Sequence, residues 1–136
     1  MGLTTTKYFR WDDSGALKLD GTAGSFYAII KHCLTEAGWS IAFDDPGNFK
    51  IAFRNSMAHG GSGGYLRVHD DGSFTGGGRV ASWRAYESMT DIDTGALQCC
   101  NDWVWKAREA GGAQVADAVR RCWVIVADER TCYLST

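Results

Sequence analysis

The chain has 136 residues, of which 14 are basic and 16 acidic, giving a formal net charge of −2. Hydrophobic residues make up 45% and charged residues 22%, a balance typical of a folded protein and unlike that of a disordered chain. This length predicts a single domain over residues 1–136. Without a long Lys/Arg run, direct nucleic-acid binding is not expected, and without a long apolar stretch, no membrane association is expected either.

The first predicted elements are a strand, a helix and a hairpin. Residues 6–11 form an aromatic, strand-like segment that ends in the turn formers of residues 12–15. Residues 22–37 have the helical period, with Thr22 or Ser25 as the expected N-cap. The apolar side chains that share one face of this helix are Phe26, Ile29, Ile30, Cys33, Leu34 and Ala37. Residues 39–43 and 49–54 alternate around a turn and predict a hairpin.

The second half predicts further strands. The glycine-rich residues 59–64 indicate a flexible link into a strand at 65–69, which a second hairpin returns through residues 79–87. Residues 90–95 have the composition of a loop, and residues 103–106 that of a short strand. The β-rich runs 123–127 and 131–134 predict a closing hairpin. The expected fold class is therefore α+β: an antiparallel β-sheet of several short hairpins with one N-terminal helix packed on a face.

One tetrapeptide resembles a catalytic motif. Residues 93–96 read Asp-Thr-Gly-Ala, which retroviral-type aspartic proteases carry at a site that two chains complete by dimerising. In those enzymes an apolar strand precedes the motif, whereas residues 89–92 are mixed in character. A dimeric aspartic protease that uses Asp93 is therefore kept only as a remote alternative.

The remaining signals for chemistry are incomplete. Asp91, Asp93 and Gly95 resemble the start of a calcium loop whose later acidic ligands are missing. The glycine clusters lack the Lys-Ser/Thr ending of a phosphate-binding loop. Three histidines share no face of one element: His32, His59 and His69. Five cysteines form no CxxC pair and indicate free thiols: Cys33, Cys99, Cys100, Cys122 and Cys132. We therefore predict no catalytic, cofactor-binding or metal-binding residues, no cofactor and no enzyme activity.

Several sequence blocks together resemble a known family. In the first half these blocks are residues 8–13, 15–16, 21–25 and 65–68, and in the second half residues 84–95 and 123–134. Their pattern is similar to that of small virion structural proteins of tailed bacteriophages and prophages. The members often continue past the strand at 131–134, whereas this sequence ends at Thr136.

The resemblance implies a structural role in a virion. The expected partners are other virion proteins and copies of the chain itself, and a tail, neck or baseplate position is preferred over capsid decoration. The protein would fold in the host cytoplasm before assembly. The alternative is a module that binds a host glycan or a host protein through exposed tryptophans such as Trp83, Trp103 or Trp105.

Overall fold

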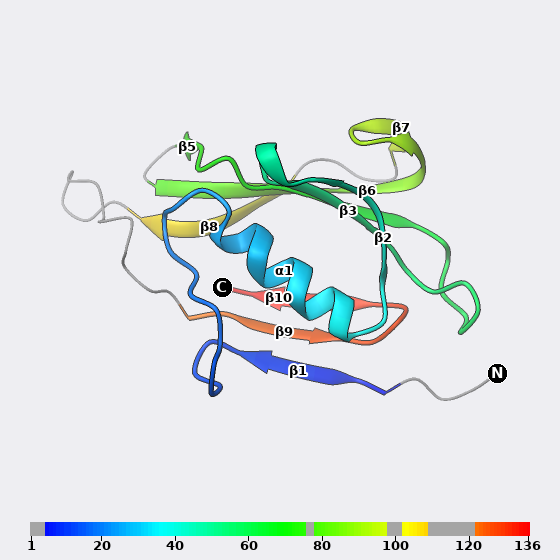
Figure 1. Ribbon diagram of the computed structural model, residues 1–136, viewed down its shortest axis with the longest axis horizontal. Helices are drawn as coiled ribbons and strands as arrows, with labels where there is room; N and C mark the ends of the chain where they lie inside the picture. Colours follow the sequence, from blue (N-terminus) through cyan, green and yellow to red (C-terminus); the bar gives the residue numbers. More distant parts are fainter. Residues whose placement is uncertain (1–4, 76–77, 98–101, 109–121) are drawn as a thin grey trace.

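In the part of the chain that the structure describes, the strands form two antiparallel sheets, with one α-helix between them (Figure 1). The computed structural model describes residues 5–75, 78–97, 102–108 and 122–136. Its elements are β1 (Lys7–Arg10), α1 (Ser25–Glu36), β2 (Ser40–Asp45), the 3₁₀ turn η1 (Pro46–Asn48), β3 (Lys50–Arg54), β4 (Tyr65–His69), β5 (Phe74–Thr75), β6 (Gly78–Asp91), β7 (Thr94–Leu97), β8 (Asp102–Arg108), β9 (Val124–Ala127) and β10 (Cys132–Ser135). The α+β prediction is confirmed at this level. No helix in these ranges is long and apolar enough to cross a membrane.

The larger sheet is built around β6, which is 14 residues long. Strands β4 and β5 pair with one edge of β6, and β8 and β7 pair with the other edge. Trp83 and Tyr86, for example, each have a partner residue on both sides. Strands β3 and β2 continue the sheet beyond β4. The smaller sheet has the order β1–β9–β10 and joins the two ends of the chain. Sequence periodicity predicts short hairpins, and it misses both this division into two sheets and the length of β6.

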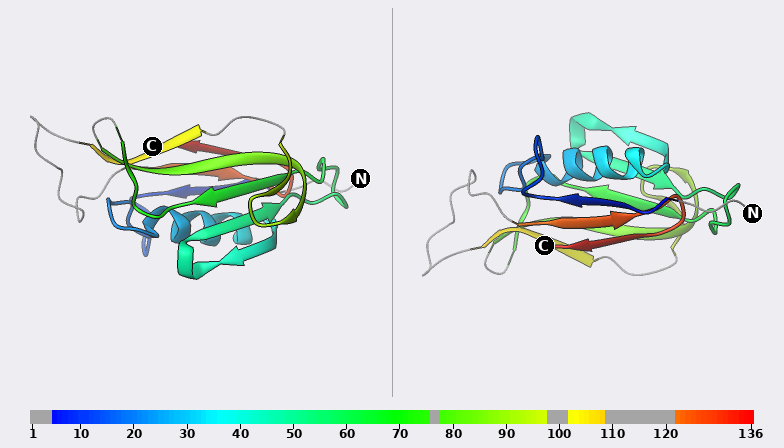
Figure 2. Two further views of the ribbon diagram at one scale, coloured as in Figure 1. Left: turned by 90° about the horizontal axis from the view of Figure 1, so that it is seen from above. Right: turned by 90° about the horizontal axis from the view of Figure 1, so that it is seen from below.

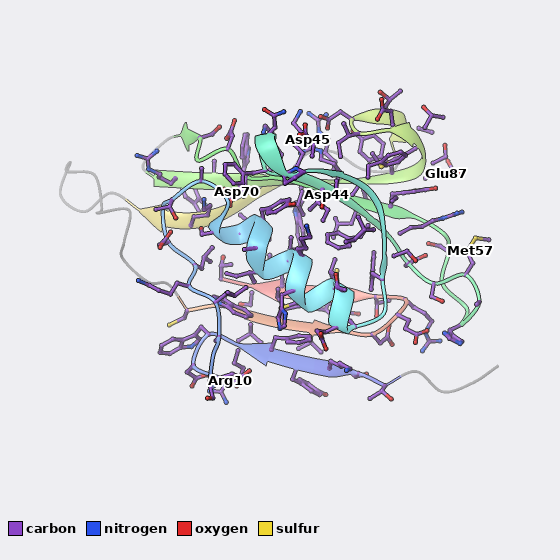
Figure 3. All side chains as sticks on the ribbon, in the orientation of Figure 1. Arg10, Asp44, Asp45, Met57, Asp70 and Glu87 are labelled. Atoms are coloured by element: carbon purple, nitrogen blue, oxygen red, sulfur yellow. The ribbon has the colours of Figure 1, made fainter. Side chains whose placement is uncertain are left out.

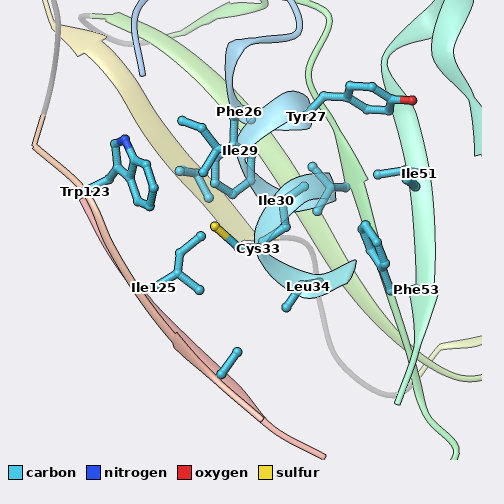
Figure 4. Packing of buried hydrophobic residues seen from close by; sticks show 14 of the residues in the cluster. Phe26, Tyr27, Ile29, Ile30, Cys33, Leu34, Ile51, Phe53, Trp123 and Ile125 are labelled. Carbon is cyan, nitrogen blue, oxygen red and sulfur yellow. The ribbon is translucent and has the colours of Figure 1, made fainter. Parts of the chain in front are cut away.

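Helix α1 packs its apolar face into the space between the sheets (Figures 2 and 4). All six residues of the predicted stripe are at most 4% exposed. Together with side chains from both sheets they form one buried cluster. Its members from the sheets and their ends include Ile51, Phe53, Val68, Val104, Trp123 and Ile125. The helix therefore contributes to a core that is shared by residues from β3 to β9, and this explains why its period is so regular.

The N-terminal end of α1 is capped from a distant strand. Gly24 occupies the N-cap with a left-handed φ of 83° and offers no side chain. The carboxylate of Asp70, just after β4, accepts hydrogen bonds from the N–H groups of Phe26 (2.8 Å) and Tyr27 (3.3 Å). Figure 3 shows Asp70 at this end of the helix. The prediction of Thr22 or Ser25 as the cap is wrong, because the Ser25 hydroxyl instead donates to the carbonyl of Asp20.

The hairpin of β6 and β7 folds over the outer face of the larger sheet. Beneath it lies a second apolar cluster of Ala52, Tyr86 and Met89, with Phe43, Tyr65 and Ile92 packed at its margin. Residues 90–91 and 94–95 are strand, and only Ile92 and Asp93 make the turn. The prediction of a loop over residues 90–95 is therefore wrong, because cross-strand pairing overrides the turn-rich composition.

The glycine-rich segment 59–64 is held by a network of hydrogen bonds. The Gly63 N–H donates to the side chain of Asn55 (2.6 Å), and the Gly61 N–H donates to the carbonyl of Ser56 (2.8 Å). His59 contacts the carboxylate of Glu129, in the turn between β9 and β10. This segment is thus attached to the smaller sheet, and the prediction of a flexible link is not supported by its contacts.

Candidate functional site

Asp93, the residue singled out by the protease-like motif, lies in an ion-pair cluster on the outer face of the larger sheet. Its carboxylate is 2.7 Å from Lys50 Nζ and 2.8 Å from Arg67 Nε. Burial would raise the pKa of Asp93, but the hydrogen bond from Lys50 and the charges of Arg67, Lys50 and Arg84 outweigh this and hold the pKa below its ordinary value. The carboxyl group is therefore ionised at neutral pH.

The pairing with Arg67 is electrostatic rather than a directed hydrogen bond. The Arg67 side chain is only 4% exposed, and its Nε has no hydrogen-bond partner in spite of the short distance to Asp93. Its Nη1 donates to the Ser82 hydroxyl at 3.1 Å. Because Asp93 is the counter-ion of the nearly buried Arg67 guanidinium, it has a clear structural role.

The glycine of the motif also has a structural explanation. A Cβ at Gly95 would lie 1.9 Å from the carbonyl oxygen of Ser88 and 2.8 Å from the Cα of Met89, on the neighbouring strand β6. Only glycine lets the two backbones approach this closely. An aspartic protease dyad needs two carboxyl groups that share a proton. In such a dyad the neighbouring carboxylate raises the pKa of one carboxyl group, whereas the cations Lys50, Arg67 and Arg84 lower the pKa of Asp93, so its surroundings do not resemble one.

A buried ion pair lies beneath α1. Lys106 on β8 and Asp70 are both fully buried, and the Lys106 Nζ donates to the carboxylate of Asp70 and to the carbonyl of Thr22. The two carboxylate oxygens of Asp70 are thus divided between Lys106 and the N-terminal N–H groups of the helix. Every polar group here has a partner, so this cluster joins three segments and offers no vacant position for a ligand.

The other reactive side chains do not converge. Burial, with a contribution from the charge of Asp13, raises the pKa of the Cys33 thiol to about 12, and burial raises that of Cys132 to about 11. Both thiols are therefore protonated and weakly nucleophilic at neutral pH. In the ranges that the structure covers, no three His, Cys, Asp or Glu side chains could hold a metal ion. Cys99 and Cys100 lie outside the described residues.

One pocket lies between β1, the loop that follows it and α1. It measures about 430 Å³, and the apolar side chains that line it include Phe9, Ile29 and Trp123. His32 also lines this pocket and packs edge-on against Phe9 with ring centroids 6.0 Å apart. The Trp123 indole N–H is already bonded to the carbonyl of Leu17. The pocket holds no pair of acid and base groups in hydrogen-bond contact, so it does not define a reaction.

Two exposed aromatic surfaces remain. On the smaller sheet, Tyr8 and Tyr133 are both aligned with Val126 in the strand pairing, and they are 70% and 72% exposed. On the larger sheet, Trp103 and Trp105 of β8 are 51% and 37% exposed. Trp83, the third tryptophan predicted to bind a partner, packs instead against the main core.

Comparisons with protein-family models, with curated proteins and with solved structures found no match to this chain.

Proposed function

We propose that the chain is a structural component of a tailed-bacteriophage virion and acts through protein contacts rather than catalysis. The resemblance of its sequence blocks to small virion proteins supports the phage assignment, and a tail, neck or baseplate position is preferred over capsid decoration. The partners are neighbouring virion proteins and further copies of the chain.

The observation that carries the contact role is the outer surface of the smaller sheet. Paired residues on neighbouring antiparallel strands project to the same face, so Tyr8, Val126 and Tyr133 form one continuous row across β1, β9 and β10. We name these three residues the aromatic row. Tyrosines are enriched at protein interfaces because they combine a large apolar ring with a polar group. The row therefore fits a protein partner.

The strand edge that β10 forms beside this row supports the same role. Among the described residues, neither β1 nor β10 pairs with a further strand on its outer side. Strand edges in natural proteins are commonly protected by charge, and β10 carries no charged side chain. A neighbouring subunit that adds a strand to this edge would satisfy its backbone groups.

The experiment is to purify particles of a phage that encodes the chain, separate capsids from tails and identify the proteins of each fraction by mass spectrometry. We expect the chain in the tail fraction at a fixed copy number. A double variant, Tyr8→Ala with Tyr133→Ala, should fold normally and be incorporated less. Met57→Ala is the matched control, because Met57 is also exposed (61%) but lies outside the row. Absence of the chain from all particle fractions would refute the proposal.

A further inference from the structure

The outer face of the larger sheet carries two neighbouring tryptophans. Along β8 the side chains alternate: Val104 and Lys106 are buried toward the core, so Trp103 and Trp105 project from the opposite face. Residues two apart on a strand are separated by about 7 Å. The β6–β7 hairpin covers the part of this face around Ala52 and Tyr86, whereas both tryptophans remain exposed.

A row of polar side chains extends across the sheet from Trp103. The strand pairing aligns Trp103 with Ser82, Ser82 with His69, and His69 with Lys50. Because adjacent strands are about 4.8 Å apart, this row is roughly 14 Å long. At its far end, a hollow of about 560 Å³ is lined by His69, Lys50, Asp71, Asn48, Phe49 and Gly47. We name the row and the two tryptophans the tryptophan face.

The described charges on the tryptophan face and on the neighbouring ladder row balance. The row of the tryptophan face contains Lys50 and, opposite it on β2, the carboxylate of Asp45, and the next row contains Arg67 and Arg84. Asp71 contacts His69, and Asp93 contacts Lys50 and Arg67, so three positive groups meet three negative groups. Burial lowers the pKa of His69 more than the charge of Asp71 raises it, so this imidazole is neutral at neutral pH. Among the residues that the structure describes, this surface thus offers hydrogen-bonding groups with no excess charge to attract an ionic ligand.

This combination fits one class of ligand. A pyranose ring has an apolar C–H face, which stacks on an aromatic ring, and a rim of hydroxyl groups, which need donors and acceptors. A nucleic acid or an acidic glycan would require excess positive charge, which the balance of charges does not provide. We propose that the tryptophan face binds a neutral oligosaccharide, with sugar rings stacked on Trp103 and Trp105 and hydroxyl groups bonded along the row Ser82, His69 and Lys50.

The test is titration calorimetry of the purified chain with three neutral hexasaccharides: N-acetylchitohexaose, cellohexaose and maltohexaose. Polygalacturonate serves as an anionic comparison. We expect at least one neutral hexasaccharide to bind, and Trp103→Ala to weaken that binding about tenfold or more. Trp105→Ala should act in the same direction. Met57→Ala is the matched control, since it removes an exposed apolar side chain that lies outside both the tryptophan face and the aromatic row and should leave the affinity unchanged.

Circular dichroism and the urea midpoint establish that each variant is folded, and a change confined to the tryptophan variants supports the proposal. It is overturned if none of the three neutral hexasaccharides binds at millimolar concentration, or if only polygalacturonate binds. It is also overturned if Met57→Ala weakens binding as much as Trp103→Ala. These outcomes are independent of particle incorporation, so the virion role and the glycan site can fail separately.

Discussion

Asp93 lies in the turn between β6 and β7 with a left-handed φ of 61°, a conformation that Asp and Asn adopt more readily than most residues. Its carboxylate forms ion pairs with both Lys50 and the nearly buried Arg67. The motif that resembles a protease site therefore combines a turn residue, a counter-ion and a glycine at a close backbone contact. Each of these roles can be tested by a single substitution.

The first prediction concerns the charge of Asp93. Asp93→Asn keeps the left-handed backbone but leaves Arg67 without its counter-ion, so we expect the free energy of unfolding at pH 7 to fall by about 1–3 kcal/mol. Because the pKa of Asp93 is lowered in the folded state, its contribution is complete above the unfolded carboxyl pKa of about 4 and disappears as the pH falls through the lower folded value.

Urea denaturation of the two proteins from pH 7 down to pH 3 measures this effect. The difference in the free energy of unfolding between the wild type and Asp93→Asn should become smaller as the pH falls. A difference in stability that is independent of pH would contradict the electrostatic role.

The second prediction concerns Gly95. Gly95→Ala introduces a Cβ that overlaps the Ser88 carbonyl oxygen, so the β6–β7 hairpin must shift, and we expect a loss of about 2 kcal/mol or more in urea denaturation. Gly47→Ala is the control, because the nearest atom to its new Cβ is 3.8 Å away. Equal urea midpoints for Gly95→Ala and Gly47→Ala would show that the hairpin accommodates the new Cβ without loss of stability.

At the scale of elements, the third prediction concerns the buried pair of Asp70 and Lys106. Lys106→Met leaves a buried carboxylate at the helix N-terminus without its cation, and we expect a loss of about 3–5 kcal/mol. Adding Asp70→Asn should restore part of this loss, since a neutral amide oxygen can still accept from the Phe26 N–H. A double-mutant cycle measured by urea denaturation gives the coupling. Additive effects would mean that the two side chains act independently.

The same elements show what the sequence could predict. The helix was predictable because its six apolar residues follow one period, and β8 was predictable in part from the run 103–106. The cap on α1 could not be predicted, because Asp70 is 44 residues from Phe26 in the sequence and reaches the helix only through a tertiary contact. The tryptophan face shows the same limit: Trp103 was a candidate from its residue type, but its alignment with His69 and Lys50 depends on strand register.

At the scale of the molecule, the core joins both sheets to α1, so we expect cooperative unfolding. The fourth prediction is that Cys33 on the helix and Cys132 on β10 become reactive toward iodoacetamide at the same urea concentration, as followed by peptide mass spectrometry. Cys122 is exposed, and it should react without denaturant. Earlier labelling of Cys132 than of Cys33 would mean that the smaller sheet opens separately.

The pairing of β1 with β9 also has a consequence for synthesis on the ribosome. Arg10 pairs with Val124, which is translated 114 residues later. At a synthesis rate of about 5–20 residues per second, the first strand waits roughly 6–23 seconds for its partner. During that interval Tyr8 and Phe9 belong to a nascent segment with an unpaired backbone, open to chaperones or to another nascent chain. Polysomes that translate this message should therefore favour strand exchange between neighbouring copies, and slower elongation should lengthen the exposure.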